Sequence, residues 1–208
     1  MTIIFRCYIA RMHSAPTRKE LTHERIVETA ARAIRRGGFR GVGVAEIMKE
    51  AGLTHGGFYA HFPSRDALLA EALERAGRDG QERMARALAA PRTGGRSALR
   101  ALVEGYLSES HLRSTESGCP VAALASEMPR QPLAVRKAAA QRVRGLVTLV
   151  EGALPAGAPK DSAFAIASQL VGALQLARAL GDNAEGKALL AAVRRSVLAL
   201  HDAAPRSP

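Results

Sequence analysis

The chain has few aromatic side chains and few cysteines, and both shortages narrow the possible folds. Only 4% of its 208 residues are aromatic and none is tryptophan, so its apolar residues are mostly Ala, Leu and Val. Such a composition suits helix packing better than strands. Cys7 and Cys119 are too few and too far apart for a disulfide framework, and no Cys and His spacing is typical of a zinc site. We expect neither a metal nor a cofactor.

Long apolar runs and internal repeats are also missing, so we expect neither a membrane partner nor a solenoid. The short apolar patches of residues 1–16 are interrupted by Arg6 and Arg11, whereas a signal peptide has a continuous apolar core. We interpret residues 1–16 as a loose N-terminal arm, in which Met12 is an alternative translation start. The expected location is the cytoplasm.

The chain is strongly basic, with a net charge of +11 and a sequence pI of about 10.7. Such a charge favours a polyanionic partner such as nucleic acid or an anionic membrane surface. The excess is +2 in residues 1–15, +3 in residues 16–66 and +6 in residues 67–208. Because it is spread along the chain, the charge permits nucleic-acid binding without locating it.

Apolar spacing and capping residues predict an all-α fold with an N-terminal three-helix domain followed by a helical bundle. We expect Thr22 to cap a first helix that ends at Gly37 and Gly38, a second helix from about Val44 to Ala51, and a third after Thr54. Further helices are predicted after Ser64, after Pro91 to Gly95, after Pro120, between Pro132 and Pro155, from Phe164 to Leu180 and from Ala184 to Leu200.

The segment from Gly43 to Phe62, GVAEIMKEAGLTHGGFYAHF, has the spacing of a helix-turn-helix. The inward positions are predicted to be Ala45, Ile47, Ala51, Leu53 and Phe58. The residues left outside are Thr54, His55, Gly56, Gly57, Tyr59 and His61. Their hydroxyl and imidazole groups can reach DNA phosphates or base edges, and adjacent glycines let bare backbone approach closely. The alternative is that the two glycines form only a loose turn.

Residues 26–69 resemble the N-terminal domain of the TetR/AcrR family of regulators. The resemblance rests on the pattern IVETAARAI, on Gly38 with Phe39, on the AGL of 51–53, on Tyr59 with His61 and Phe62, and on SRDALL. It implies a homodimeric, non-enzymatic transcriptional regulator, a repressor that leaves its double-stranded DNA operator when a small-molecule effector binds; an activator is the alternative. It also implies that Arg65 binds a phosphate.

Residues 17–66 are therefore predicted to be the DNA-binding domain. We include Gly43 and Val44, at the start of the second helix, among its DNA-binding residues. Gly43 stands where the family usually has a Thr or Ser cap, which removes one hydroxyl contact.

Residues 67–208 are predicted to form the effector-binding and dimerisation domain. The last two helices are apolar around most of their circumference, which suggests a dimer interface at Leu170, Leu174, Val193 and Val197. The alternative is that they are core helices of one subunit. Candidate effector-pocket residues are Tyr106, His111, Cys119, Met128, Phe164 and Gln175, each of which is otherwise ordinary core. Cys119 is either redox-active or an inert buried thiol.

An enzyme is not expected, because the chain shows no nucleophile with a base, no paired carboxylates and no phosphate-binding glycine loop at recognisable spacing. A helical scaffold without DNA activity is the remaining class. In that case residues 54–62 would be one more short helix, an interpretation against which the predicted exposure of Tyr59, His61 and Arg65 argues.

Overall fold

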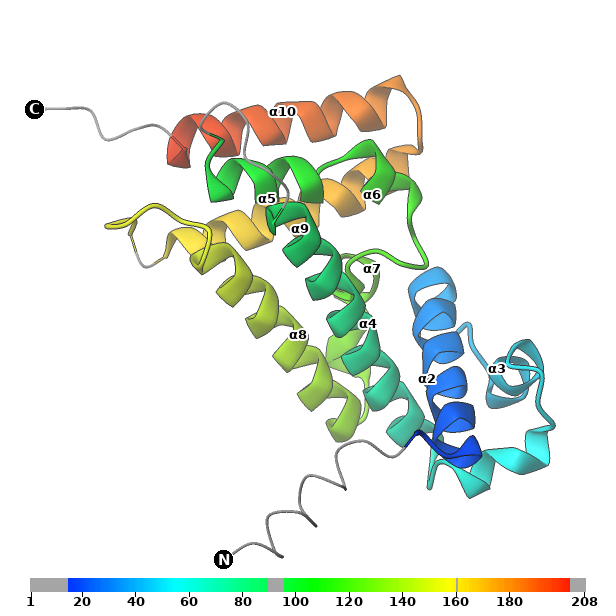
Figure 1. Cartoon of the computed structure of the whole chain (residues 1–208). Coiled ribbons are helices and arrows are strands. Elements are labelled where there is room, and N and C mark those ends of the chain that lie inside the picture. Colours follow the sequence, from blue (N-terminus) through cyan, green and yellow to red (C-terminus); the bar gives the residue numbers. More distant parts are fainter. Residues whose placement is uncertain (1–14, 90–95, 160, 203–208) are drawn as a thin grey trace, which may run out of the picture.

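A computed structural model of the chain describes residues 15–89, 96–159 and 161–202, and these residues are helical with no strand (Figure 1). The predicted all-α class is therefore confirmed. The α-helices are α2 (Arg18–Gly37), α3 (Val44–Glu50), α4 (Arg65–Ala89), α5 (Ala98–Tyr106), α6 (Glu109–Arg113), α7 (Pro120–Leu124), α8 (Leu133–Glu151), α9 (Ser162–Leu180) and α10 (Ala184–His201). Two 3-10 helices, η1 (His55–Ala60) and η3 (Met128–Arg130), complete the described elements.

Helix α2 begins earlier than the sequence analysis predicts. Its N-cap is Thr17, whose hydroxyl accepts the Glu20 N–H, and the Glu20 carboxylate accepts the Thr17 N–H in return. Thr22, the expected cap, lies inside the helix and donates its hydroxyl to the Arg18 carbonyl. The reciprocal Thr17 and Glu20 bonds satisfy two backbone donors, which a cap at Thr22 with Arg25 could not do.

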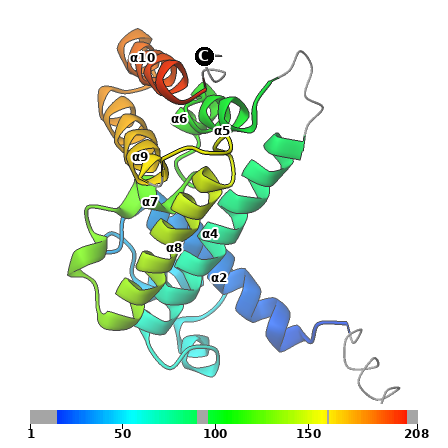
Figure 2. The same ribbon diagram turned by 90° about the vertical axis from the view of Figure 1, so that its left-hand side faces the viewer.

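The helices form two packed regions along one long axis (Figures 1 and 2). Helices α2, α3 and η1 lie at one end, and α5, α9 and α10 lie at the other. Helices α4 and α8 pack side by side between them and run in the same direction. The expected arm and the expected break at 91–95 lie outside the described residues, apart from Ala15 and Pro16.

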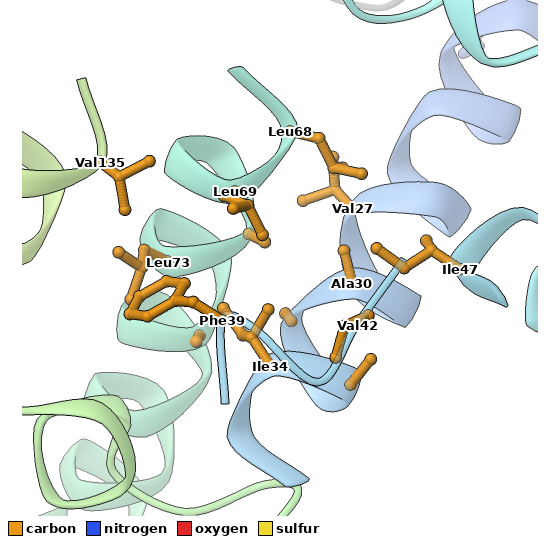
Figure 3. Close-up of a cluster of buried hydrophobic side chains, with 14 of the residues drawn as sticks. Val27, Ala30, Ile34, Phe39, Val42, Ile47, Leu68, Leu69, Leu73 and Val135 are labelled. Atoms are coloured by element: carbon orange, nitrogen blue, oxygen red, sulfur yellow. The ribbon is translucent and has the colours of Figure 1, made fainter. Parts of the chain in front are cut away.

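The first core joins the N-terminal helices to α4 and α8 (Figure 3). Ile34 and Phe39 lie below Leu69 and Leu73 of α4, Ile47 lies beside Ala30 and Val42, and Val135 of α8 lies on the other side of Leu69 from Val27. All of these side chains are buried. Because this core extends past residue 66, a movement of α4 or α8 displaces side chains that support the N-terminal helices.

The second core lies among α5, α8, α9 and α10 and corrects the predicted dimer interface. Leu170, Leu174 and Val197 have no exposed surface and Val193 is half-buried, so at least the first three pack within one subunit. The pattern of apolar residues could not separate inner from outer faces, since both faces are apolar. The outer faces instead carry Phe164, Leu176, Leu180 and Leu200, which are exposed.

Helix α9 is also the one described helix whose length and composition would allow it to cross a membrane. Its inner residues pack against α8 and α10.

Candidate functional site

The helix-turn-helix is built from α3, a tight turn and η1. Gly52 in the turn has φ +71°, and the following Leu53 N–H donates to the Met48 carbonyl at 2.8 Å. Ile47, Met48 and Phe58 fix the two elements from inside. The prediction was wrong for Ala45, which is exposed. Met48 takes the inner position instead. Its methyl group faces Gly57, at which an added Cβ would lie 3.7 Å away.

The outer side of these two elements carries five of the nine predicted DNA-binding residues, whereas Val44 and Gly57 lie partly against the core. Thr54, His55 and Gly56 are exposed, and Tyr59 exposes 71% of its surface. A Cβ at Gly56 would meet nothing within 4 Å, so its backbone is open to a partner. Gly43 is also exposed, while Val44 and Gly57 are half-buried. At the start of α3 the Gly43 N–H donates to the Glu46 carboxylate at 3.1 Å, which stabilises the helix without a hydroxyl cap.

The other two predicted residues turn inward. Arg65 is half-buried, and its Nη2 donates to the carbonyls of Phe39 and Val42, so it braces the loop before α3. His61 has its ring among those of His23 and Phe62, with a buried Nδ1 that has no described partner. Burial, the nearby His23 and Lys19 lower the pKa of His61. A neutral imidazole is therefore favoured there.

A cavity of about 320 Å³ lies between α4, α5, α6, α7 and α8. Tyr106, His111 and Cys119 line it, as the pocket prediction requires. The other three predicted residues do not line it. Met128 is buried in the first core, Phe164 exposes 64% of its surface, and Gln175 is half-buried on α9. Their helical spacing does not distinguish a cavity wall from a packed core or an outer face.

Glycines inside helices keep this cavity open. Gly77 and Gly80 of α4, Gly105 of α5 and Gly145 of α8 all line it. Each glycine in a helix interior costs about 1 kcal/mol relative to alanine. A Cβ at Gly77 would lie 2.2 Å from Arg142 Nη1, and one at Gly145 would lie 3.1 Å from Gln81 Nε2. Their helix-interior position is the signal by which the sequence analysis could have found the cavity.

His111 joins three segments of the cavity wall. Its Nδ1 donates to the Tyr106 carbonyl at 2.7 Å, and its Nε2 accepts the Cys119 N–H at 3.0 Å. Burial lowers the pKa of His111 to about 4, because the hydrogen bond to Tyr106 does not offset desolvation and the nearby Arg178 and Arg83. The imidazole is therefore neutral at pH 7, with a tautomer fixed by its two partners.

Residues next to the cavity contact the end of α2, a connection that the sequence analysis missed. Glu116 forms an ion pair with Arg36 at 3.0 Å, and the Gly118 carbonyl accepts from Arg35 Nη1 at 3.4 Å. Glu127 Oε2 accepts the Phe39 N–H at 3.1 Å. Because Gly118 directly precedes the cavity residue Cys119, the cavity wall and the support of the helix-turn-helix are adjacent in the chain.

Comparison with known proteins assigns both regions. The family model described as bacterial regulatory proteins, tetR family, matches residues 26–72, and the model described as tetracyclin repressor-like, C-terminal domain, matches residues 95–193. The chain belongs to the TetR family of transcriptional regulators. It is thus a DNA-binding regulator and not an enzyme, as the resemblance implies.

Individual TetR-family relatives agree with this assignment. An uncharacterised HTH-type transcriptional regulator of Mycobacterium tuberculosis is 32% identical over 76% of this chain and 85% of its own length. The HTH-type transcriptional repressor NemR of Escherichia coli is 28% identical over 65% of this chain and 68% of its own.

Solved structures share the fold. The reduced form of E. coli NemR has a TM-score of 0.67 at 24% identity, covering 84% of this chain and 95% of that chain. FadR of Bacillus subtilis in complex with stearoyl-CoA has a TM-score of 0.62 at 18% identity, covering 84% of this chain and 96% of that chain.

Proposed function

We propose that this TetR-family protein is a cytoplasmic, homodimeric repressor that leaves its operator when a small molecule enters the cavity. Residues 17–66 would read DNA, and residues 67–208 would bind the effector and dimerise. The observation that carries the proposal is the direct contact of residues 116–118 with α2, because it links the cavity wall to the DNA-reading end. The names of two relatives are consistent with it, since NemR is a repressor and FadR is solved with an acyl-CoA.

DNA contacts are assigned to the outer side of α3 and η1. Thr54 and Tyr59 present hydroxyls that can donate to phosphate oxygens, and His55 can reach a phosphate or a base edge. The open backbone at Gly56 permits close approach to the duplex. Arg65 is assigned a phosphate only through guanidinium nitrogens other than Nη2, which the loop carbonyls occupy.

The dimer interface is assigned to the outer faces of α9 and α10. These helices contact one another closely and expose four large apolar residues, Phe164, Leu176, Leu180 and Leu200. Between these residues lie small ones such as Ala165, Ser168 and Gly172, which permit close helix packing. A second copy of this surface would bury them, and the two DNA-reading ends of that dimer would have to match half-sites about 34–36 Å apart, one helical turn of DNA.

Release of DNA would follow from a shift of the cavity wall. A ligand between α4 and α8 would displace these helices or the segment before α7, and the bonds from Glu116, Gly118 and Glu127 would transmit that movement to α2. Small changes in the spacing of the two reading ends suffice to lose register with two half-sites.

A promoter fusion tests the repressor assignment. A reporter gene behind the DNA upstream of the protein's own gene is measured in a host with and without the protein. Repression predicts lower expression with the wild type and recovery with a Tyr59→Ala and His55→Ala double variant. Higher expression with the wild type would identify an activator, and no difference for this or any genomic fragment would contradict the proposal.

A further inference from the structure

The charged groups of the cavity are of one sign. Arg83 and Arg142 line it, and no Asp or Glu does. The structure gives neither arginine an ion pair with a described residue, and the Arg142 Nε is buried without a hydrogen-bond partner. Asp79, on the same helix as Arg83, is already paired with Arg35 and Arg75.

The remaining polar groups favour the same kind of ligand. Tyr106 is 2% exposed, and its buried hydroxyl lies near the Cys119 thiol without forming a well-oriented hydrogen bond to any described residue. Burial, together with the nearby Cys119, raises the pKa of Tyr106 well above its usual value, so the phenol keeps its proton and can donate it. His111 adds no charge, since both ring nitrogens are already bonded.

An apolar wall continues from the charged end. Leu146 and Leu149 follow Arg142 on α8 at helical spacing, and Met84 follows Gly77 and Gly80 on α4. Arg142 lies against Gly77, and Gly145 lies against Gln81 one turn further along both helices. The cavity thus has Arg142 at the level of Gly77, nearer the DNA-reading region, and an apolar wall at Met84 and Leu149 further along both helices. Arg83, which is next to Met84 in the sequence, is exposed.

We propose that this cavity binds an organic anion, a molecule with a carboxylate at one end and an apolar body at the other. The carboxylate would pair with the Arg142 guanidinium and accept from the Tyr106 hydroxyl, while the body would lie along Met84, Leu146 and Leu149. An ion pair and a hydrogen bond would then satisfy the two buried groups that have no partner. The inference rests on the proposed effector role of the cavity and names the chemical class of the effector.

Isothermal titration calorimetry with two sets of ligands tests the proposal; each set holds an acid, an amide and an amine that share one apolar body. The first is 3-phenylpropionate with its primary amide and the corresponding amine, and the second is the same set built on 6-phenylhexanoate. In at least one set we expect the acid to bind at least tenfold more tightly than the amide, and the amine not to bind. Inorganic phosphate has no apolar body, so we expect it not to compete with the acid for the cavity.

Four variants assign the preference to the cavity. Arg142→Gln should weaken the acid at least tenfold and leave the amide unchanged, and Tyr106→Phe should weaken the acid severalfold. Gly80→Leu, whose Cβ meets nothing within 4 Å, should fill the cavity and abolish all binding. Arg144→Gln, an exposed position on the same helix, is the matched control and should bind like the wild type. Circular dichroism checks that each variant is folded, and Arg83→Gln replaces Arg142→Gln if the latter is not.

Four outcomes would overturn the proposal. They are amides or amines that bind as tightly as the acids, a preference for the acid that survives the folded cavity variant (Arg142→Gln, or Arg83→Gln in its place), competition by phosphate alone, and no binding by either acid. Operator binding is measured separately with the same ligands. Acids that enter the cavity without releasing DNA would uphold the ligand class and refute effector control, whereas DNA binding without any acid binding would refute only the ligand class.

Discussion

Glu127, from the segment after α7, holds the backbone of Phe39 at the end of α2 through a hydrogen bond of 3.1 Å. A Cβ at Gly38 would lie only 2.3 Å from the other carboxylate oxygen of Glu127. Gly38 also has φ +74°, which residues other than glycine rarely adopt. Only glycine therefore fits the turn that this carboxylate covers. The bond ties the segment that carries η3 to the loop in front of the helix-turn-helix.

Glu127→Ala tests this contact. Removal of a charge-assisted hydrogen bond should lower the free energy of unfolding by about 1–3 kcal/mol and weaken operator binding, because the loop before α3 loses an anchor. Urea denaturation and fluorescence anisotropy with operator DNA measure the two effects. Glu151→Ala, an exposed position at the end of α8, should change neither. Equal effects of both variants would mean that the Glu127 contact is not specific.

Arg65→Ala should destabilise the protein, contrary to what the sequence alone suggests. The side chain donates to two loop carbonyls in a half-buried position, and its loss leaves them unpaired, at about 1–3 kcal/mol. Thermal melting measures this change. Arg40→Ala, an exposed position in the same loop, serves as control. An unchanged melting temperature for Arg65→Ala would restore a role confined to phosphate binding.

Tyr59→Phe should weaken operator binding about three- to tenfold without affecting stability. The side chain is 71% exposed, so the folded protein loses no internal contact, whereas the complex loses one hydrogen bond worth about 0.5–1.5 kcal/mol. The same chemical change at the buried Tyr106, far from the DNA-reading face, should leave operator affinity unchanged. DNA binding by Tyr59→Phe at wild-type strength would remove Tyr59 from the interface.

His111 predicts a specific loss of stability in mild acid. Its pKa is about 4 in the folded protein and near 6.5 when unfolded, so the unfolded state binds more protons between these values. The stabilisation is complete above pH 6.5 and is lost as the pH falls toward 4, by about 2 kcal/mol between pH 7 and pH 5. Urea denaturation of the wild type and of His111→Asn at both pH values isolates it. A fall of equal size in both proteins would show that His111 does not contribute it.

Leu176→Arg should prevent dimerisation, since it places a charge in the proposed interface where an apolar side chain is 60% exposed. Light scattering coupled to size exclusion should give the mass of one chain for the variant and of two for the wild type. Leu133→Arg, an equally exposed apolar position at the start of α8, should remain dimeric. A dimeric Leu176→Arg variant would move the interface elsewhere.

The sequence predicts the helices well because apolar spacing and caps are local signals. The helices predicted after Pro120, between Pro132 and Pro155, from Phe164 to Leu180 and from Ala184 to Leu200 all appear where they are expected. The start of α2 was also readable, since Thr17 and Glu20 have capping-box spacing.

Residues that contact distant segments could not be predicted in this way. Leu170 and Leu174 share the apolar character of the exposed Leu176, and only packing against α8 and α10 separates the buried face from the open one. In the sequence, Arg142 and Glu127 resemble ordinary surface charges. Only the fold shows that Arg142 lies against α4 and that Glu127 lies against the Gly38 turn. The argument that a buried hydroxyl or amide needs a partner favours Tyr106 and Gln175. Tyr106 lines the cavity, whereas Gln175 does not, because the argument says nothing about which face of its helix a residue occupies.

The most direct test of the account is fluorescence anisotropy with the DNA upstream of the protein's own gene, at two salt concentrations and against unrelated competitor DNA. The account predicts specific binding that weakens with salt at a stoichiometry of one dimer per site, because phosphate contacts release counterions. Weak binding that does not distinguish this DNA, or any genomic fragment, from competitor would contradict it.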